Sequence, residues 1–380
     1  MLKRLAISIF LGANLCTILL LWLSVALTYI SPEHLPRLSL LTLAFPVFLA
    51  ANILFLLFWL LFKARLIWVP IAGMLLVGGH ILDYTPLNLQ SNSNNPAADT
   101  TLTIITYNAN YPKSKEESTQ ALLQFLKTTN ADIVCIQEIS RQFFNINRKW
   151  LDSTDYQVRQ DHSIAILSKH PFLSDAIHID YPTRKNHSVA CWINCHGDSL
   201  LVINNHLESN HLSNKDKDEY THTIIDPNQQ AIKSSTRILI NKLSKAANYR
   251  GAQTDSICSI IDHNLNHSTI VCGDLNDTPI SYTYQQLAKR LTSAYRQAGT
   301  GPGFTYSRRS FPVRIDHLFF TNDWTCTSCR IDHTICSSDH YPLIVRLTKK
   351  NTVNHRFYIK KPPFTLLFKE KDISLHAIMA

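Results

Sequence analysis

Short polar motifs follow apolar, β-branched runs at several places between residues 103 and 342. Runs such as Thr103–Thr106 and Thr269–Cys272 predict buried strands, because strands favour Val, Ile and Thr. A strand that ends in a carboxylate, an amide or an imidazole delivers that group to the rim of a sheet. The motifs are Tyr107-Asn108, Gln137-Glu138, Asn205-His206-Leu207, Gly273-Asp274-Leu275-Asn276, Arg314-Ile315-Asp316-His317 and Ser338-Asp339-His340-Tyr341-Pro342. We expect them to form one site, and metal-assisted hydrolysis of a phosphoester is the leading interpretation.

The N-terminal part of the chain contains three long apolar runs. Leu5–Ile30 and Leu40–Phe62 each reach the ~20 residues that a helix needs to cross a bilayer, and Leu66–Leu82 is a shorter third. A cleaved signal peptide is the alternative for the first run, but its apolar region would be only about 7–15 residues long. The sequence therefore predicts a membrane anchor over residues 1–85, with three transmembrane helices in the lipid bilayer.

The distribution of basic residues predicts how this anchor is oriented. The loop between the first two runs carries one arginine, whereas four basic residues lie before the first run and after the second: Lys3, Arg4, Lys63 and Arg65. Basic loops tend to stay in the cytoplasm. We therefore expect a multi-pass protein of the cytoplasmic membrane, with an extracytoplasmic catalytic domain.

Three further segments follow the anchor. Residues 86–101 are polar and aperiodic, which predicts a linker, and residues 351–380 form a C-terminal tail of unknown role. Residues 102–350 alternate many strand patterns with a few amphipathic helices, at 115–129, 229–249 and 254–263. This pattern predicts an α/β domain of two stacked mixed β-sheets flanked by helices, a four-layer α/β sandwich. The lack of a Gly-x-Gly-x-x-Gly motif after a strand argues against a dinucleotide fold.

Charge and cysteine content leave alternatives open. The net charge of +9 fits either a solvated basic surface beside a membrane or the steering of an anionic substrate. Arginines are not interleaved with aromatic residues as in a nucleic-acid track. Cys135 and Cys272 lie in predicted core strands, where free cysteine behaves as a small apolar residue. A surface disulfide between Cys326 and Cys336 is an alternative use of two others.

Carboxylates at two strand ends have a plausible catalytic use. A lone Glu such as Glu138 is usually solvated at a strand end, yet Mg²⁺ needs only one or two carboxylates besides water and phosphate. Asp274 and Asn276 are two residues apart, so their side chains lie on one side if the strand continues. They could also form a simple Asx turn. As a functional pair, they offer an acceptor for a water proton beside an amide donor.

Two imidazoles complete the candidate set. His340 lies just before the last predicted strand, and Asp316 offers a carboxylate that could fix its tautomer and protonation. A surface Asp-His pair is commonly inert, which is the alternative reading. His206 adds a second imidazole, although seventeen histidines make any single one a weak signal.

Together these motifs resemble the endonuclease/exonuclease/phosphatase superfamily, which has the deoxyribonuclease I-like fold. The resemblance covers about residues 102–347, and Gly273–Asn276 and Ser338–Pro342 are its most specific motifs. Ala165–Lys169 is similar to an internal strand motif of the family. Two departures concern Asn110, where some nucleases have an Asp near the metal, and His162-Ser163, where many members have Gly.

The resemblance implies a role for each candidate residue. Glu138 would hold the divalent metal with support from Asp339, and the ion is expected to be magnesium (Mg²⁺), with manganese (Mn²⁺) as an alternative. The phosphate-binding residues would be Asn108 and Asn276.

The acid–base groups follow from the same resemblance. Asp274 would orient or deprotonate the attacking water. His340, paired with Asp316, would contact the phosphoryl oxygens, and His206 would face the phosphate or the leaving group.

The sequence thus predicts metal-dependent hydrolysis of a phosphoester or phosphodiester bond by an extracytoplasmic, membrane-anchored domain. The fold does not choose between a nucleic acid and a phospholipid headgroup as the substrate. A catalytically idle protein that binds a lipid or a partner on the same fold is the alternative.

Overall fold

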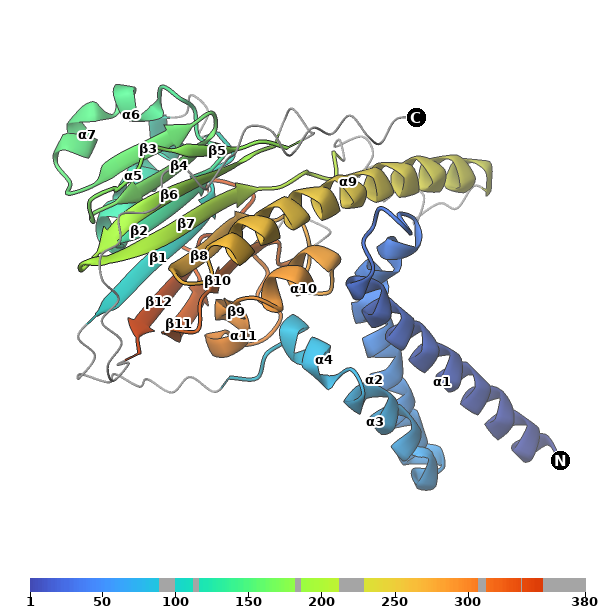
Figure 1. Cartoon of the computed structure of the whole chain (residues 1–380). Helices are drawn as coiled ribbons and strands as arrows, with labels where there is room; N and C mark the ends of the chain where they lie inside the picture. The colour runs from blue at the N-terminus through green and yellow to red at the C-terminus, as the bar shows by residue number, and fades with distance from the viewer. Residues whose placement is uncertain are drawn as a thin grey trace.

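The structure is a computed structural model, and it describes residues 1–88, 100–111, 116–181, 186–211, 229–306, 312–335 and 337–350. It has two parts, an α/β sandwich and an N-terminal bundle of helices that projects from one side of it (Figure 1). Most of the predicted linker, the C-terminal tail and Cys336 lie outside the described residues.

Two six-stranded mixed sheets stack face to face in the sandwich. The first sheet contains, in spatial order, β11 (Trp324–Ile331), β12 (Leu343–Lys349), β1 (Thr101–Asn108), β2 (Ile133–Gln137), β4 (Ile164–Ser168) and β3 (Gln157–Asp161). The second contains β5 (Ile177–Ile179), β6 (Ser188–Cys195), β7 (Asp198–His206), β8 (Ser268–Asp274), β10 (Asp316–Phe320) and β9 (Thr292–Ser293). The pairs β1–β2 and β7–β8 are parallel, and the other neighbours are antiparallel.

Helices cover the outer faces of both sheets. The first sheet carries α5 (Glu116–Thr129), α6 (Phe143–Ile146) and α7 (Arg148–Asp152), and the second carries α9 (Gln229–His263) and α10 (Tyr282–Ala288). A short helix, α11 (Ala294–Ala298), packs at the edge against β11. Apolar clusters fill the space between the sheets and under each helical layer. The predicted four-layer α/β sandwich is confirmed.

The two helices predicted at 229–249 and 254–263 are one continuous helix, α9, so that prediction was wrong in its division. Residues 250–253 contain Gly251, which lowers helix propensity by only about 1 kcal/mol and does not end a helix. Nearby tertiary contacts favour continuity, because Arg250 and Gln253 of this segment both bond to the backbone of Glu208.

Buried polar side chains connect the two sheets. The Gln137 side-chain amide donates to Asn204 Oδ1, and Asn204 Nδ2 donates to the carbonyls of Ile136 and Ala165. Among the described residues the eight cysteines are free thiols, and Cys135 and Cys272 lie in the core between the sheets, where the sequence placed them.

The N-terminal bundle consists of apolar helices: α1 (Leu2–Ala26), η1 (Leu27–Tyr29), η2 (Leu38–Ala44), α2 (Phe45–Phe62), η3 (Ala64–Leu66), α3 (Trp68–Leu75) and α4 (Gly78–Tyr84). Two stretches, Lys3–Tyr29 and Leu38–Phe62, are long and apolar enough to cross a membrane. The predicted third span is a pair of helices, α3 and α4, bent by 69°. The Gly78-Gly79 pair lies at this break, a common cause of a kink. The bundle is compatible with a membrane anchor of two spans, or three if the bent pair counts as one.

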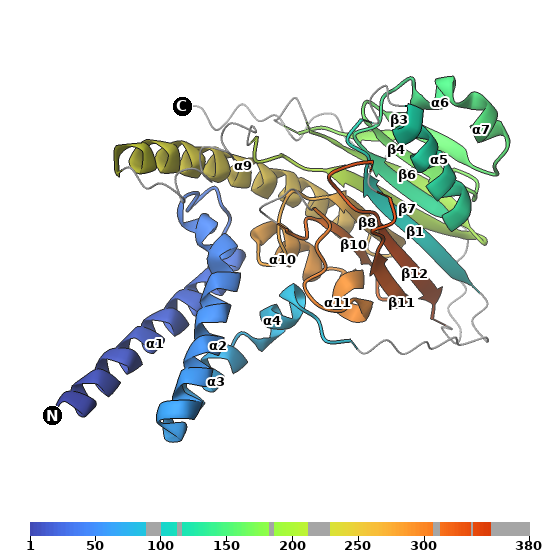
Figure 2. The same ribbon diagram turned by 180° about the vertical axis from the view of Figure 1, so that it is seen from behind.

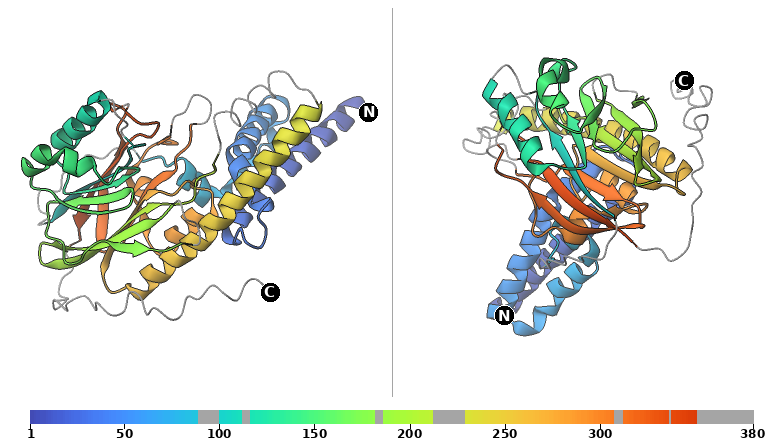
Figure 3. Two further views of the ribbon diagram at one scale, coloured as in Figure 1. Left: turned by 90° about the horizontal axis from the view of Figure 1, so that it is seen from above. Right: turned by 90° about the vertical axis from the view of Figure 1, so that its left-hand side faces the viewer.

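The bundle packs on the helical side of the second sheet. η1 contacts α10 and η2 contacts α9, and α4 ends beside α11 (Figure 2; Figure 3, left). Polar contacts strengthen this junction, since Arg296 Nη1 lies 3.2 Å from Asp83 Oδ1. Arg314, which is buried, donates to the carbonyls of Asp83 and Tyr84. Strand β10 begins two residues later, at Asp316, and the backbone N–H of Ile315 donates to Thr305 Oγ1.

Candidate active site

The strand register brings the predicted polar residues into two facing rows. In the second sheet His206 pairs with Asp274, and Asp274 pairs with Asp316, so three adjacent strands present these side chains side by side. In the first sheet Asn108 pairs with Gln137, the residue before Glu138. Because β1 and β8 lie inside their sheets and contact each other across the sandwich, the two rows meet at one end of it.

Gly273 lets strand β8 present Asp274 at this point. Its φ of +130° is a conformation that residues with a Cβ rarely adopt. A Cβ built on this residue would also lie only 2.0 Å from the carbonyl oxygen of Asn205 on the neighbouring strand. The motif Gly-Asp-Leu-Asn therefore needs glycine at its first position for backbone reasons.

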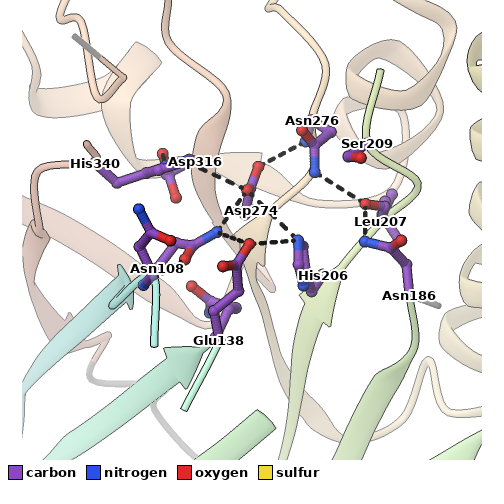
Figure 4. A network of polar contacts seen from close by, with 12 residues as sticks. Asn108, Glu138, Asn186, His206, Leu207, Ser209, Asp274, Asn276, Asp316 and His340 are labelled. Atoms are coloured by element: carbon purple, nitrogen blue, oxygen red, sulfur yellow. Dashed lines mark hydrogen bonds and ion pairs between the residues drawn. The ribbon is translucent and has the colours of Figure 1, made fainter. Parts of the chain in front are cut away.

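Asn108 connects the carboxylates of the two rows (Figure 4). Its Nδ2 donates to Asp274 Oδ2 at 3.0 Å and to Glu138 Oε1 at 3.2 Å. Asn108 and Asp274 are each only 1% exposed, whereas the Glu138 side chain keeps 23% of its surface exposed. One amide thus holds a buried carboxylate and a solvent-facing carboxylate in a fixed relation.

His340 and Asp316 form a buried ion pair beside Asp274. His340 Nδ1 donates to Asp316 Oδ2 at 2.9 Å, and His340 Nε2 lies 3.7 Å from Asp274 Oδ2. Burial by itself lowers the pKa of His340, but the charges of Asp316 and Asp274 and the bond to Asp316 raise it to about 10. The two carboxylates thus favour the charged form of the imidazole, which suits contact with a phosphate. The ring of Tyr306 packs edge-on against it.

His206 faces the same two carboxylates from strand β7. Its Nε2 lies 3.5 Å from Glu138 Oε1 and 3.9 Å from Asp274 Oδ2. Its backbone N–H donates to the carbonyl of His187, which fixes the end of the strand.

Asn276 lies at the outer side of the cluster. Its backbone N–H donates to Asp274 Oδ1 at 2.8 Å, and its Nδ2 donates to the Leu207 carbonyl at 2.9 Å. Asn186 Nδ2 donates to the same carbonyl. An amide nitrogen carries two protons, so one N–H of Asn276 remains for a ligand.

Asp339 is the predicted site residue that the structure places least centrally. Its Oδ1 accepts a bond of 2.9 Å from Asn110 Nδ2, and no described contact joins it to Glu138. Asn110, which departs from the family pattern, therefore holds the one carboxylate that was predicted to support Glu138.

The donor set suits a hard divalent cation. The carboxylates of Glu138 and Asp274 both accept from Asn108, and oxygen ligands of this kind are those that Mg²⁺ prefers. Asp274, Asp316 and His340 also have ligand atoms within 4.8 Å of one another, but the bond between Asp316 and His340 occupies two of these groups. Glu138 is the more accessible carboxylate and is the better position for an ion.

Several supporting residues were missed in the sequence. Ser338 Oγ donates to the backbone carbonyl of Asn108 and accepts from the backbone N–H of His340, so it joins the first and last motifs. Arg250 of α9 places its Nε 3.3 Å from Asp277 Oδ2, and its Nη1 donates to the Glu208 carbonyl. These two contacts anchor the loops after β8 and β7 to α9. Ser338 could have been noticed within its motif. Arg250 gives no local signal, since its contacts are distant in sequence.

The four-layer sandwich and its strand-end cluster of carboxylates, amides and imidazoles define the deoxyribonuclease I-like class of protein. The chain belongs to the endonuclease/exonuclease/phosphatase family, whose sequence model matches residues 105–340. Members of this superfamily are generally phosphoester hydrolases that depend on a divalent metal. Residues 7–84 match a second model, a domain of unknown function (DUF8431). No curated protein matches the sequence.

Solved structures of low sequence identity resemble the chain. Truncated Caenorhabditis elegans TDP2 is 17% identical over 65% of this chain and 98% of its own, with a TM-score of 0.44. The catalytic domain of human nocturnin with bound sulfate is 15% identical over 67% and 95%, with a TM-score of 0.48. An endonuclease/exonuclease/phosphatase from Beutenbergia cavernae is 16% identical over 66% and 72%, with a TM-score of 0.47.

Proposed function

We propose that the chain is a membrane-anchored, Mg²⁺-dependent hydrolase of a phosphoester or phosphodiester, with its catalytic domain on the extracytoplasmic side. Family membership supports the reaction class. The observation that carries the proposal is the bridge from Asn108 to both Asp274 and Glu138, with the His340 imidazole 3.7 Å from Asp274 Oδ2. This arrangement offers an ion site, a base and a cationic contact for phosphate in one place.

Glu138 holds the ion in this proposal, with Asp339 in the surrounding shell through Asn110. Mg²⁺, or Mn²⁺ in its place, supplies neutralisation of charge on the phosphoryl oxygens. Asn276 donates its remaining N–H to a non-bridging oxygen of the scissile phosphate. Both N–H groups of Asn108 are bonded to carboxylates, so Asn108 donates to the phosphate only once Glu138 turns to the ion and frees one of them.

Asp274 is the proposed acceptor for the proton of the attacking water. Its position is fixed by the Asn108 amide and the Asn276 backbone N–H. The His340 imidazolium, held by Asp316, stabilises the charge that develops on the phosphoryl group, as preorganised donors do in other hydrolases. His206 faces the same space and contacts the phosphate or the leaving group.

The arrangement of the anchor supports the extracytoplasmic orientation. The N-terminus and the turn from α2 to α3 lie at the end of the bundle that is remote from the sandwich (Figures 1 and 2). Lys3, Arg4, Lys63 and Arg65 belong to this remote end. Basic ends stay cytoplasmic, so the sandwich belongs on the opposite side of a cytoplasmic membrane. A reporter that is active only in the cytoplasm should stay silent when fused after Lys350, and a strong signal would exclude this orientation.

The reaction is tested with the full chain purified in detergent micelles, against nucleic acids, phospholipid headgroups and small phosphomonoesters. Glu138→Gln keeps the shape of the side chain but removes the charge that holds the ion, so turnover should collapse. Glu117→Gln, in the exposed first turn of α5, is the matched control and should turn over normally. Near-normal turnover by Glu138→Gln at low Mg²⁺ would remove Glu138 from the site. Tight binding of a lipid or partner without any turnover would favour the catalytically idle alternative.

A further inference from the structure

A second cluster of ionisable side chains lies at one edge of the sandwich, separate from the strand-end site. It contains three imidazoles and two carboxylates, and we call it the edge cluster: Asp161, His162, His178, Asp180 and His187. The proposed reaction assigns no role to any of them.

The edge cluster joins the outermost strands of the two sheets. Asp161 ends β3, the outer strand of the first sheet, and His162 lies in the turn from β3 to β4. His178 is the middle residue of β5, the outer strand of the second sheet, and His187 directly precedes β6. Groups from both sheets therefore converge where each sheet ends.

Asp161 lies at the centre of the edge cluster. Its two carboxylate oxygens bond separately to His162 Nδ1, at 2.9 Å, and to His178 Nδ1. The second nitrogen of His178, Nε2, lies 3.0 Å from Asp180 Oδ1. One carboxylate thus spans the gap between the sheets by holding an imidazole from each.

The three imidazoles also lie against one another. Ring centroids of His162 and His187 are 5.0 Å apart, those of His162 and His178 are 5.3 Å apart, and those of His178 and His187 are 5.6 Å apart. Ligand atoms of Asp161, His162 and His178 all lie within 4.8 Å of one another. Imidazoles packed this closely repel one another when they are protonated. As neutral ligands they can share one cation without this repulsion.

The chemistry of the donors selects the kind of cation. Imidazole nitrogens with a carboxylate are typical ligands of Zn²⁺ and related transition ions. Mg²⁺ prefers oxygen ligands and keeps much of its water, so it is a poor match for this set. Access from solvent exists, because the His162 and His178 side chains are 56% and 36% exposed.

His162 has a left-handed backbone conformation in the turn between β3 and β4. Its φ is +47°, a left-handed conformation that glycine adopts more easily. This conformation places a histidine, rather than a residue without a side chain, directly beside Asp161 and next to the ring of His187.

We propose that the edge cluster binds one transition ion of the Zn²⁺ class, and that this ion links the outermost strands of the two sheets. Asp161, His162 and His178 are the ligands, and His187 packs its ring against both imidazoles. Binding replaces the imidazole N–H bonds to Asp161 by metal bonds, so each imidazole presents a nitrogen lone pair and the displaced protons leave to solvent.

The test uses the full chain in detergent micelles, stripped with a chelator and then titrated with zinc chloride. The principal variant is the double substitution His162→Asn and His178→Gln, because Asn tolerates the left-handed turn better than other side chains. Glu138→Gln removes the other candidate ion site, and His263→Gln at the exposed end of α9 is a matched control. Bound zinc per chain and the melting temperature are measured with millimolar Mg²⁺ present throughout.

Wild type, Glu138→Gln and His263→Gln should each retain one zinc ion that Mg²⁺ does not displace. At about a hundred times the dissociation constant, zinc should raise their melting temperatures by about 5 °C or more. The double variant should lose that ion and the temperature rise. Should it fail to fold, Asp161→Asn provides the same comparison. Equal zinc content and equal melting shifts in the wild type and the variant would overturn the proposal.

Discussion

His317 should make the fold sensitive to acid, because it is a buried imidazole that the folded protein keeps neutral. It is 1% exposed, and its Nε2–H donates to the Asp277 carbonyl at 2.9 Å. Burial, with a further contribution from the charge of Arg314, lowers the pKa of His317 to about 3, although the bond to Asp277 acts in the opposite direction. The ordinary histidine pKa of 6.5 applies once the chain unfolds.

The sign and size of the effect follow from these two pKa values. At a pH between these two values, His317 is protonated in the unfolded chain but not in the folded chain. This contribution to stability is therefore present above about pH 6.5 and is lost as the pH falls towards 3. Each pH unit in this window is worth about 1.4 kcal/mol. Acidification from pH 6.5 to about pH 5 should therefore remove about 2 kcal/mol through His317 alone.

His317→Phe isolates this contribution. Phe keeps an aromatic ring between Tyr284 and Phe319 but loses the bond to Asp277, which should cost about 1–3 kcal/mol at pH 7.5. Because Phe does not titrate, its deficit relative to the wild type should shrink on acidification and nearly vanish at about pH 5. Denaturant titrations of the full chain in detergent micelles at several pH values measure this difference. His263→Phe is the exposed control, and a constant difference between His317→Phe and wild type would refute the reasoning.

Three other predictions concern the candidate active site and its strand. Asp274→Ala and His340→Ala should each lower turnover by about 10²–10⁴ without a matching loss of melting temperature, and the double variant should lose far less than the product. Asp316→Asn should lie between these and the wild type, since the imidazole stays but its charged partner is lost; turnover equal to wild type would contradict the pairing. Gly273→Ala should cost more than about 3 kcal/mol of unfolding free energy, because its Cβ meets the Asn205 carbonyl. A normal denaturation midpoint for Gly273→Ala would show that the strands separate easily there.

The strand-end motifs could be predicted because their signals are local. A β-branched run followed by a polar group marks both a strand and its end. The register of neighbouring strands then aligns these polar groups with one another. His206, Asp274 and Asp316 are far apart in sequence, yet they are direct partners across three strands. The contact between Asn108 and Asp274 was not predicted, since it depends on how the two sheets stack.

The edge strands escaped prediction for a physical reason. β3 (Gln157–Asp161) is half-buried along most of its length and carries polar residues at four of five positions, so its pattern lacks the apolar alternation of an inner strand. β5 has only three residues. The edge cluster was missed with them, because Asp161 and His178 belong to different sheets and nothing in the sequence pairs those sheets' outer strands.

Arg314 shows how the anchor and the catalytic strand depend on each other. Its guanidinium is buried, donates to the carbonyls of Asp83 and Tyr84 at the end of α4, and stacks 4.1 Å over the Tyr295 ring. A buried charge is costly unless it is fully bonded. Removal of the anchor would take away two of its acceptors, only two residues before Asp316. The isolated sandwich therefore differs energetically from the same residues in the full chain, and the strand that carries the His340 partner would be the first to respond.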